Sequence, residues 1–262
     1  MTAQTVVIKI GGSTLGHGDT SLSDVVALQT RGTNVVVVHG GGAEISKWLS
    51  RLGLESRFVD GLRVTGDEEL RVVTAVLAGL VNKMLVAQIL EHGGKAVGLS
   101  GVDGGFVTAA ITNPALGNVG EINCVDPRLL NTLLGAGFIP IVSTVCWSPV
   151  GGHSDILNVN ADDVAAEVAI AIGASSLIYL TDVPGILDSA GQVISHVSAH
   201  AVEPLIGAGT IRGGMIPKAR ACMRASRHMP RTRIIDGTAM HALLREDEAD
   251  PGGTTIVTDK LA

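Results

Sequence analysis

The chain has 262 residues, of which 46% are hydrophobic and only 2% aromatic, so it can bury a sizeable core built from Ala, Val, Ile and Leu. Its formal net charge is −6, and no run of Lys or Arg exceeds two residues. This distribution excludes the basic surface by which proteins bind nucleic acid or an anionic membrane, so we expect neither partner.

Residues 1–4 carry no basic segment and lead directly into a strand-like run, which argues against a signal peptide. The apolar stretch 164–180 is interrupted by Glu167 and Gly173, which argues against a membrane span. The three cysteines and eight histidines form no motif typical of a disulfide framework or a transition-metal site. We therefore expect a cytoplasmic protein that holds no metal with its own side chains.

Short β-branched runs alternate with longer helical stretches along the chain. Continuous apolar strands separated by helices indicate a mainly parallel sheet covered on both faces, because parallel strands need crossover helices. The glycine- and threonine-rich stretch 102–121 breaks the pattern and predicts a hairpin or lid inserted on the sheet. A second change near residue 174 predicts a lobe boundary, with lobes 1–174 and 175–262. The predicted strands are 6–10, 34–38, 95–99, 139–143, 177–180 and 233–235.

Two glycine clusters follow the first two predicted strands. The first strand contains Lys9 and ends in Gly11 and Gly12, and the second ends at His39, followed by glycines 40–42 and a helical stretch. Ligands bind at the carboxyl ends of strands in open α/β sheets, where glycine lets backbone N–H groups approach a phosphate. A helix that begins after such a loop adds its positive dipole end. Neither cluster matches a P-loop or a dinucleotide-binding fingerprint.

Isolated charged residues stand at three further places. Arg63 is expected in a turn, where its planar fork could grip a carboxylate through two parallel hydrogen bonds, or could simply be solvated. The run 158–163 opens an apolar helix with two Asn and two Asp, of which two would suffice for an N-cap. Lys218 follows a glycine pair and is expected just before a helix. Two lysines near glycine-rich loops suit phosphoryl transfer, in which positioning and electrostatics supply most of the catalysis.

These motifs, in this order, resemble the amino acid kinase family and, within it, the N-acetylglutamate kinases. The similarity runs from residue 7 to residue 257, and its most specific parts are 39–42, 61–65, 77–79 with 82–83, 158–162 and 213–218. The resemblance implies a three-layer αβα sandwich with a mainly parallel central sheet, as in carbamate kinase-like folds. It also implies an N-terminal lobe that binds the acylated amino acid and dimerises, and a C-terminal lobe that binds ATP.

The activity that the resemblance implies is transfer of the ATP γ-phosphoryl group to the side-chain carboxylate of N-acetyl-L-glutamate, giving an acyl phosphate in arginine biosynthesis. Mg²⁺ would be carried by the phosphates. The accepting carboxylate is already ionised at neutral pH, so no general base is needed.

The resemblance also assigns roles to individual residues. It implies that Lys9 and Lys218 stabilise the transferring phosphoryl group and that Asp162 orients both ammonium groups. The substrate would be held by Gly41, Gly42, Arg63 and Asn158. The nucleotide would contact Gly11, Gly12, Asp182, Val183, Pro184, Gly185, Ile186, Leu187, Thr210, Ile211 and Arg212.

Two departures from the family pattern are visible. Val102 stands where many members carry a lysine, and the lid region 108–122 matches only loosely. Two other activities stay open: a kinase for aminoadipate or glutamate linked to an acidic carrier protein, and a non-catalytic sensor of amino acid or nucleotide. Arginine-inhibited hexameric members have an additional N-terminal helix. Residues 1–4 are too few to form it, so we expect a homodimer insensitive to arginine.

Overall fold

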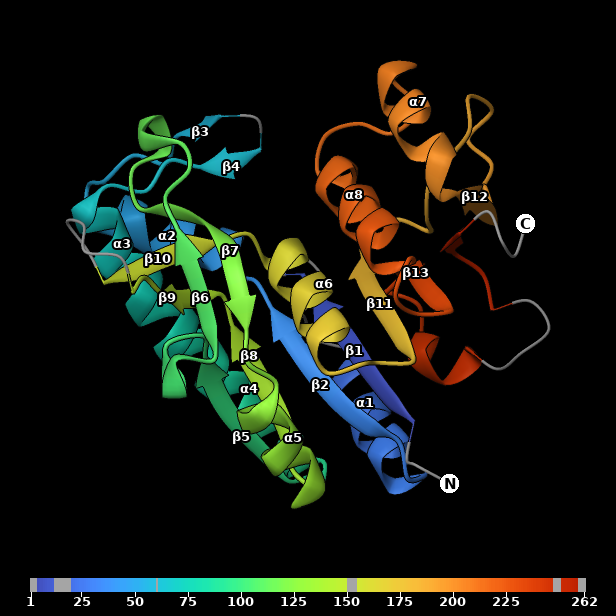
Figure 1. Ribbon diagram of the computed structural model, residues 1–262, viewed down its shortest axis with the longest axis horizontal. Helices are drawn as coiled ribbons and strands as arrows, with labels where there is room; N and C mark the ends of the chain where they lie inside the picture. The colour runs from blue at the N-terminus through green and yellow to red at the C-terminus, as the bar shows by residue number, and fades with distance from the viewer. Residues whose placement is uncertain (1–3, 12–19, 60, 150–154, 247–250, 259–262) are drawn as a thin grey trace.

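The computed structural model describes residues 4–11, 20–59, 61–149, 155–246 and 251–258. An eight-stranded sheet forms its centre, in the order β12-β14-β13-β11-β1-β2-β8-β5 (Figure 1). Neighbouring strands of this sheet are parallel except for β13 and β14. All six predicted strands are confirmed. The strands of this sheet are β1 (Thr5–Ile10), β2 (Asn34–His39), β5 (Ala96–Ser100), β8 (Ile139–Ser143), β11 (Ser176–Thr181), β12 (His196–Ser198), β13 (Arg231–Asp236) and β14 (Thr254–Val257).

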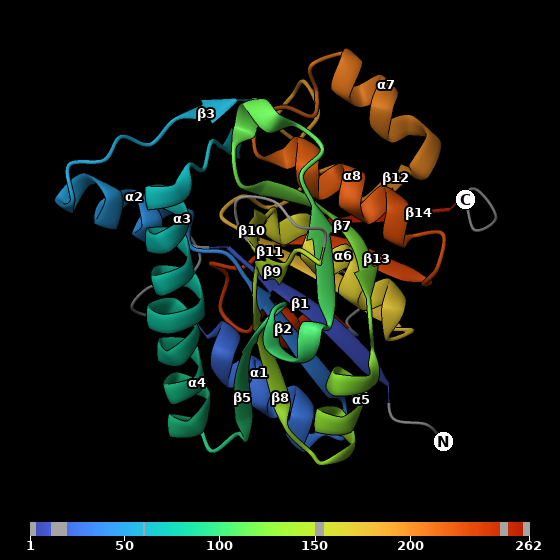
Figure 2. The same cartoon turned by 60° about the vertical axis from the view of Figure 1, so that its left-hand side comes forward.

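Helices cover both faces of the sheet, which confirms the three-layer αβα prediction (Figure 2). One face packs against α1 (Ser21–Thr30), α2 (Gly42–Arg51), α3 (Asp67–Thr74), the π-helix η1 (Ala75–Val81), α4 (Asn82–Glu91) and the 3₁₀-helix η5 (Ala242–Arg245). The other face packs against α5 (Arg128–Gly135), α6 (Ala161–Ala171), α7 (Val202–Gly207) and α8 (Met215–Ala225). The remaining short 3₁₀-helices are η2 (Asp103–Gly105), η3 (Pro114–Leu116) and η4 (Ala199–Ala201).

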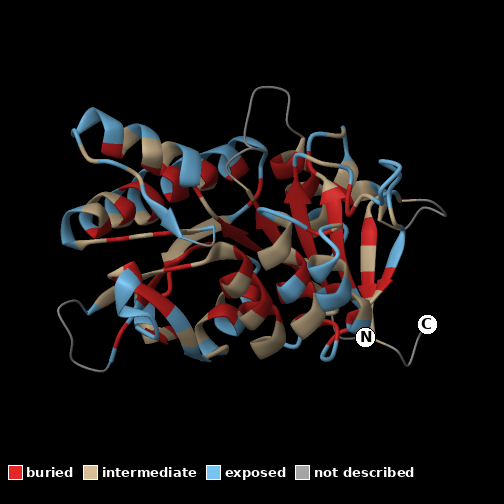
Figure 3. Cartoon of the chain, turned by 90° about the horizontal axis from the view of Figure 1, so that it is seen from above, coloured by how far each residue is buried: buried red, intermediate tan, exposed pale blue. Residues whose placement is uncertain are grey.

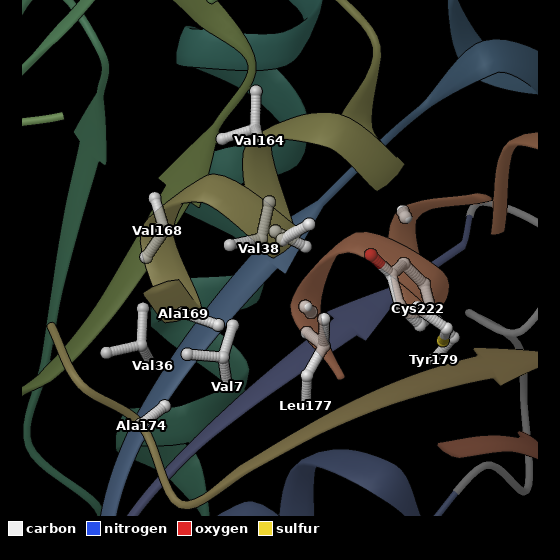
Figure 4. Packing of buried hydrophobic residues seen from close by; sticks show 14 of the residues in the cluster. Val7, Val36, Val38, Val164, Val168, Ala169, Ala174, Leu177, Tyr179 and Cys222 are labelled. Atoms are coloured by element: carbon white, nitrogen blue, oxygen red, sulfur yellow. The ribbon is translucent and has the colours of Figure 1, made fainter. Parts of the chain in front are cut away.

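Alternation along the central strands decides which side chain reaches which layer. In β1, Val6 and Ile8 belong to the core under α1 and α4, whereas Val7 belongs to the core under α6. Figure 4 shows this second core, and Figure 3 shows the buried strands between helices with exposed outer faces. Since Lys9 has the same parity as Val7, its side chain points toward the α6 layer rather than the α1 layer.

A second, smaller sheet lies beside the central one. It is a closed arrangement of β6 (Val107–Ala110), β7 (Val119–Val125), β9 (Val145–Trp147) and β10 (Ile156–Val159). The antiparallel β6 and β7 form a hairpin where a hairpin or lid was predicted for 102–121, although its second strand continues to residue 125, and β9 and β10 complete the sheet. A separate hairpin consists of β3 (Phe58–Val59) and β4 (Leu62–Arg63).

One helix is long and apolar enough to bear on the expectation that the chain has no membrane span. By length and composition alone the continuous helix Asp67–Glu91 could cross a membrane, with a mean hydropathy of 1.8 in its most apolar window. Core helices pass the same test, and this one packs Val73, Leu77 and Ile89 in the core against the central sheet. The apolar stretch 164–180, which was weighed as a membrane span from the sequence, forms most of α6 and β11 instead.

Candidate active site

Three charged side chains from three elements meet above the middle of the sheet. The carboxylate of Asp162, on α6, lies between two ammonium groups: its Oδ1 is 2.9 Å from Lys9 Nζ, and its Oδ2 is 3.3 Å from Lys218 Nζ. Lys9 comes from β1 and Lys218 from α8. The side chains of Lys9 and Asp162 are 7% and 6% exposed, so this ion pair is almost fully desolvated.

The cluster carries two positive charges and one negative charge, which leaves one net positive charge at a buried place. Burial lowers the pKa of the Lys9 ammonium, Asp162 opposes this shift, and the neighbouring Lys218 adds to it. Burial and the neighbouring cation both make the charged form of Lys9 costly. A ligand that brings negative charge would stabilise this charged form. The geometry therefore suits an anion that binds against both lysines.

Local structure explains why Asp162 is held in place. Asn160 caps α6, its side chain accepting a hydrogen bond of 2.7 Å from the Asp162 backbone N–H. The hydroxyl of Tyr179, on β11, donates to the Asp162 carbonyl oxygen at 2.7 Å, and Tyr179 is fully buried. Of the four polar residues 158, 160, 162 and 163, one thus caps the helix and another joins the lysines.

The position of Lys218 corrects one sequence-based expectation. We expected this lysine just before a helix, but α8 begins at Met215 and includes Lys218 in its first turn. Pro217 made the segment look like a loop, yet proline is tolerated in the first helical turn because the backbone N–H groups there have no intrahelical acceptor.

The glycine loops lie at the carboxyl ends of β1 and β2, as predicted. Gly11 directly follows β1, while Gly12 lies outside the described residues. The backbone N–H of Gly40 donates to the carbonyl of Ile10 at 3.2 Å, which joins the two strand ends. A Cβ on Gly41 would come within 2.7 Å of Leu77 Cδ2, so a larger residue there would require the Leu77 side chain to move.

Arg63 is buried but has only neutral partners. Its guanidinium donates to Ser56 Oγ at 2.6 Å, Ser46 Oγ at 2.8 Å and the Gly42 carbonyl at 2.9 Å. It also lies over the ring of Phe58, 4.7 Å from the centroid. Within the described chain no carboxylate forms an ion pair with it. The expectation that Arg63 lies in a turn is wrong, because it is the second residue of β4.

Asn158 lies across a small cavity from the glycine loop. Its Nδ2 donates to the hydroxyl of the buried Thr65 at 3.1 Å, which leaves its carbonyl oxygen and a second N–H hydrogen for another partner. The cavity measures about 150 Å³. All its lining residues lie between 40 and 161, among them Gly40, Gly41, Gly42, Arg63, Leu77, Thr144, Asn158 and Ala161.

A larger cavity of about 550 Å³ lies in the C-terminal part of the chain. Six of the predicted nucleotide residues line it, namely Val183, Gly185, Ile186, Leu187, Thr210 and Arg212. Asp182, Pro184 and Ile211 are not part of the lining, and Ile211 is buried. Met215 also lines this cavity and begins the helix that carries Lys218, whereas Ala161, next to Asp162, lines the smaller one. The helices that carry Asp162 and Lys218 thus each contribute a first-turn residue to one of the two cavities.

Comparison with known proteins places this site in a family. The model of the amino acid kinase family matches residues 4–236. The chain belongs to the amino acid kinase family. It is 42% identical over 259 residues to an acetylglutamate kinase of Dehalococcoides mccartyi, and the match covers 98% of this chain and 95% of the relative.

Solved structures agree with this kinase fold. The crystal structure of smu.665 from Streptococcus mutans UA159 has a TM-score of 0.84 and 30% identity, and covers 97% of this chain and 98% of that one. Carbamate kinase from Giardia has a TM-score of 0.72 at 14% identity, covering 99% and 100% of the two chains. The second likeness shows the fold alone.

Two residues of this amino acid kinase that support the glycine loop were not singled out from the sequence as site residues. Asn82, at the start of α4, lies with its Nδ2 3.1 Å from His39 Nε2, 3.2 Å from the Leu99 carbonyl and 2.8 Å from the Ile141 carbonyl. Burial lowers the pKa of His39 to about 4, so the ring is neutral at physiological pH. The contacts of Asn82 with His39 and with two neighbouring strands hold the end of β2, where the glycine loop begins. The resemblance had marked residue 82 without a role, since its partners are distant in sequence.

The described part of this kinase offers few ligands for a metal ion. Among the residues that the structure describes, no group of three or more His, Cys, Asp or Glu side chains lies close enough together to hold a metal ion. The single carboxylate at the charged cluster, Asp162, already contacts two ammonium groups. A divalent cation would therefore have to bring its other ligands with the nucleotide phosphates.

Proposed function

We propose that this chain transfers the γ-phosphoryl group of ATP to the side-chain carboxylate of N-acetyl-L-glutamate, producing an acyl phosphate in arginine biosynthesis. The observation that carries the proposal is the Lys9–Asp162–Lys218 cluster, in which Asp162 and Lys218 lie on helices whose first turns line two cavities, in a chain whose curated relatives of nearly equal length are acetylglutamate kinases. The smaller cavity would take the amino acid and the larger one the nucleotide.

In this proposal the two lysines stabilise the charge on the transferring group. As the phosphoryl group passes between two oxygens, negative charge spreads over its equatorial oxygens, and nearby fixed cations stabilise this charge more than that of the ground state. Asp162 holds both ammonium groups close together before the substrates bind, so the two lysine side chains need to move less during the reaction. Backbone N–H groups of Gly11, Gly41 and Gly42 would add neutral donors. Gly12 is proposed on the resemblance alone.

Arg63 is proposed to bind the α-carboxylate. A buried guanidinium whose partners are two hydroxyls and one carbonyl keeps its full positive charge, which favours an anion at the cavity wall. Within the described residues the Asn158 side chain keeps its carbonyl oxygen and one N–H hydrogen for the acetamido group, whose N–H and C=O need one acceptor and one donor. A free amino acid derivative therefore meets complementary groups at both ends.

The division into lobes 1–174 and 175–262 is retained as a proposal. It is supported by the cavities, because the lining of the smaller one lies wholly before residue 174 and that of the larger one wholly after it. We propose ATP as the nucleotide, contacted by residues 182–187 and 210–212, with Mg²⁺ held by its phosphates. We also propose that the protein is cytoplasmic. The chemistry that the cation would supply is neutralisation of phosphate charge.

An apolar groove on the N-terminal lobe supports a homodimer. It measures about 840 Å³ and lies between α2 and the helix Asp67–Glu91, with Leu52 59% and Leu80 37% exposed. Exposed apolar patches of this kind mark protein interfaces, and two-fold pairs are the commonest oligomers. Light scattering should give twice the chain mass of 26.8 kDa, and a monomer mass would contradict the proposal.

A coupled assay of ADP release across acidic amino acids and their N-acetyl forms tests the activity. We expect turnover that depends on N-acetyl-L-glutamate, with little on free glutamate. Turnover only with a carrier-linked substrate would favour the carrier-protein kinase, although the net charge of −6 disfavours an acidic carrier. Nucleotide binding without any ADP release would favour the sensor.

A further inference from the structure

Ser46 and Ser56 both accept hydrogen bonds from the guanidinium of Arg63. Arg63 lines the cavity, whereas neither serine does. Ser46 lies on α2, Ser56 lies in the segment between α2 and β3, and Ser56 Oγ donates to Ser46 Oγ at 3.4 Å. Both hydroxyls accept from Arg63, so two elements of the chain converge on one cation.

The hydrogen bonds can be counted on the fork of Arg63. Nη2 directs its two hydrogens to Ser46 and to the Gly42 carbonyl, and Nη1 directs one to Ser56. A guanidinium has five N–H hydrogens, so those on Nε and one on Nη1 remain. Among the described residues nothing accepts from these two. The serines thus fix the plane of the fork and leave two donors for a ligand.

We propose that Ser46 and Ser56 are positioning residues that hold Arg63 for the substrate carboxylate without neutralising it. This inference rests on the proposed function, because it assigns the supports of the group that would bind the α-carboxylate. A hydroxyl is a neutral acceptor, so it orients the guanidinium while the positive charge stays available. An Asp or Glu in the same place would orient it equally well and cancel that charge.

Alanine variants measure the positioning, and an aspartate variant measures the charge. Ser46→Ala and Ser56→Ala should each raise the KM for N-acetyl-L-glutamate by roughly tenfold, the value of one hydrogen bond to a charged group, with kcat and the KM for ATP unchanged. Ser46→Asp should raise that KM further, because it pairs with Arg63. Ser46→Thr, which keeps the hydroxyl, should restore it.

Ser50 provides a matched control. It lies one turn further along α2, is exposed, and should leave every constant unchanged when replaced by alanine. Thermal unfolding of each variant separates a loss of fold from a loss of affinity. A KM for N-acetyl-L-glutamate in the two alanine variants equal to that of Ser50→Ala would overturn the proposal, as would an equal rise in both substrates' KM values.

Calorimetric binding of N-acetyl-L-glutamate separates this inference from the activity itself. If the unaltered protein binds it but releases no ADP, the proposed function fails, and the serine variants are then compared by their affinity, which should fall by the same factor. If the unaltered protein does not bind it, both proposals are wrong.

Discussion

Two cationic places of the candidate active site differ in how their charge is balanced. At the charged cluster, two lysines share the carboxylate of Asp162, whereas Arg63 has two hydroxyls, one carbonyl and an aromatic ring. Both places are buried, so the difference is not one of solvent access. It lies in whether the chain itself supplies a negative charge.

This difference suits the two functions proposed for these places, substrate binding at Arg63 and stabilisation of the transferring phosphoryl group at the lysines. A group that binds an anion equally in the ground and transition states gains most from an uncompensated charge, since it acts through affinity. A pair of lysines that must stay together before any ligand arrives needs a carboxylate to offset their mutual repulsion. The following changes remove one charge at a time and are ordered by the size of the expected effect.

The largest effect should come from the lysines. Lys9→Ala and Lys218→Ala should each lower kcat by on the order of a hundredfold or more, with smaller changes in both KM values, because each charge acts mainly in the transition state. Steady-state rates measured beside thermal unfolding curves test this. Unchanged kcat in a folded variant would remove that lysine from the catalytic role.

Removing Arg63 should change affinity rather than rate. Arg63→Ala should raise the KM for N-acetyl-L-glutamate by about tenfold to a hundredfold with kcat nearly constant, because a contact to the α-carboxylate is uniform binding. Arg57→Ala, an exposed arginine before the same hairpin, is the control. If only the KM for ATP moved, Arg63 would belong to the nucleotide site.

The charge balance itself can be tested by pH. Burial lowers the pKa of Lys9 and Asp162 opposes this, so loss of the Asp162 charge lowers that pKa further. The reaction needs the protonated ammonium, and its rate falls as pH rises through the Lys9 pKa. In Asp162→Asn the alkaline limb of the kcat profile should therefore move to lower pH. A limb that stays in place would show that Lys9 does not set it.

The smallest effect concerns the outer contact between the two helices of the cluster. Arg224 of α8 pairs with Asp163 and, at 3.4 Å, with Glu167, both on α6. Arg224→Gln should lower kcat by only a few fold, since half-exposed pairs are weak but a shift of α8 moves Lys218. Arg220→Gln is the control, because Arg220 pairs with Glu203 of α7 instead. Equal effects in both would contradict a specific role for Arg224.

Much of the fold was predictable because its signals are local. Runs such as 139–143 are mostly apolar and rich in β-branched residues, and the strand found there has those bounds. The four-stranded sheet was only partly foreseen, since β9 and β10 are short and pair with β6 and β7 across 39 residues of chain. Pairing over such separations leaves no periodic trace in one sequence.

The site residues also differ in how far they could be predicted from the sequence. Lys9, Asp162 and Lys218 could be proposed together only through the family resemblance, and the structure brings all three into contact. Asn82 and the serines around Arg63 have no role that the sequence predicts, because a serine or asparagine in a helix or loop is usually a surface or capping residue. Their importance comes from partners 7 to 59 residues away, which only folding brings near.

The central place of β1 has a consequence for how the protein is made. β1 is the first strand of the chain, yet one of its two neighbours, β11, spans residues 176–181. Until that segment leaves the ribosome, β1 presents an open edge of unpaired backbone groups beside apolar side chains, a template for pairing with other chains. The first 174 residues synthesised alone should therefore aggregate, and chaperone demand during translation should fall once β11 has paired with β1.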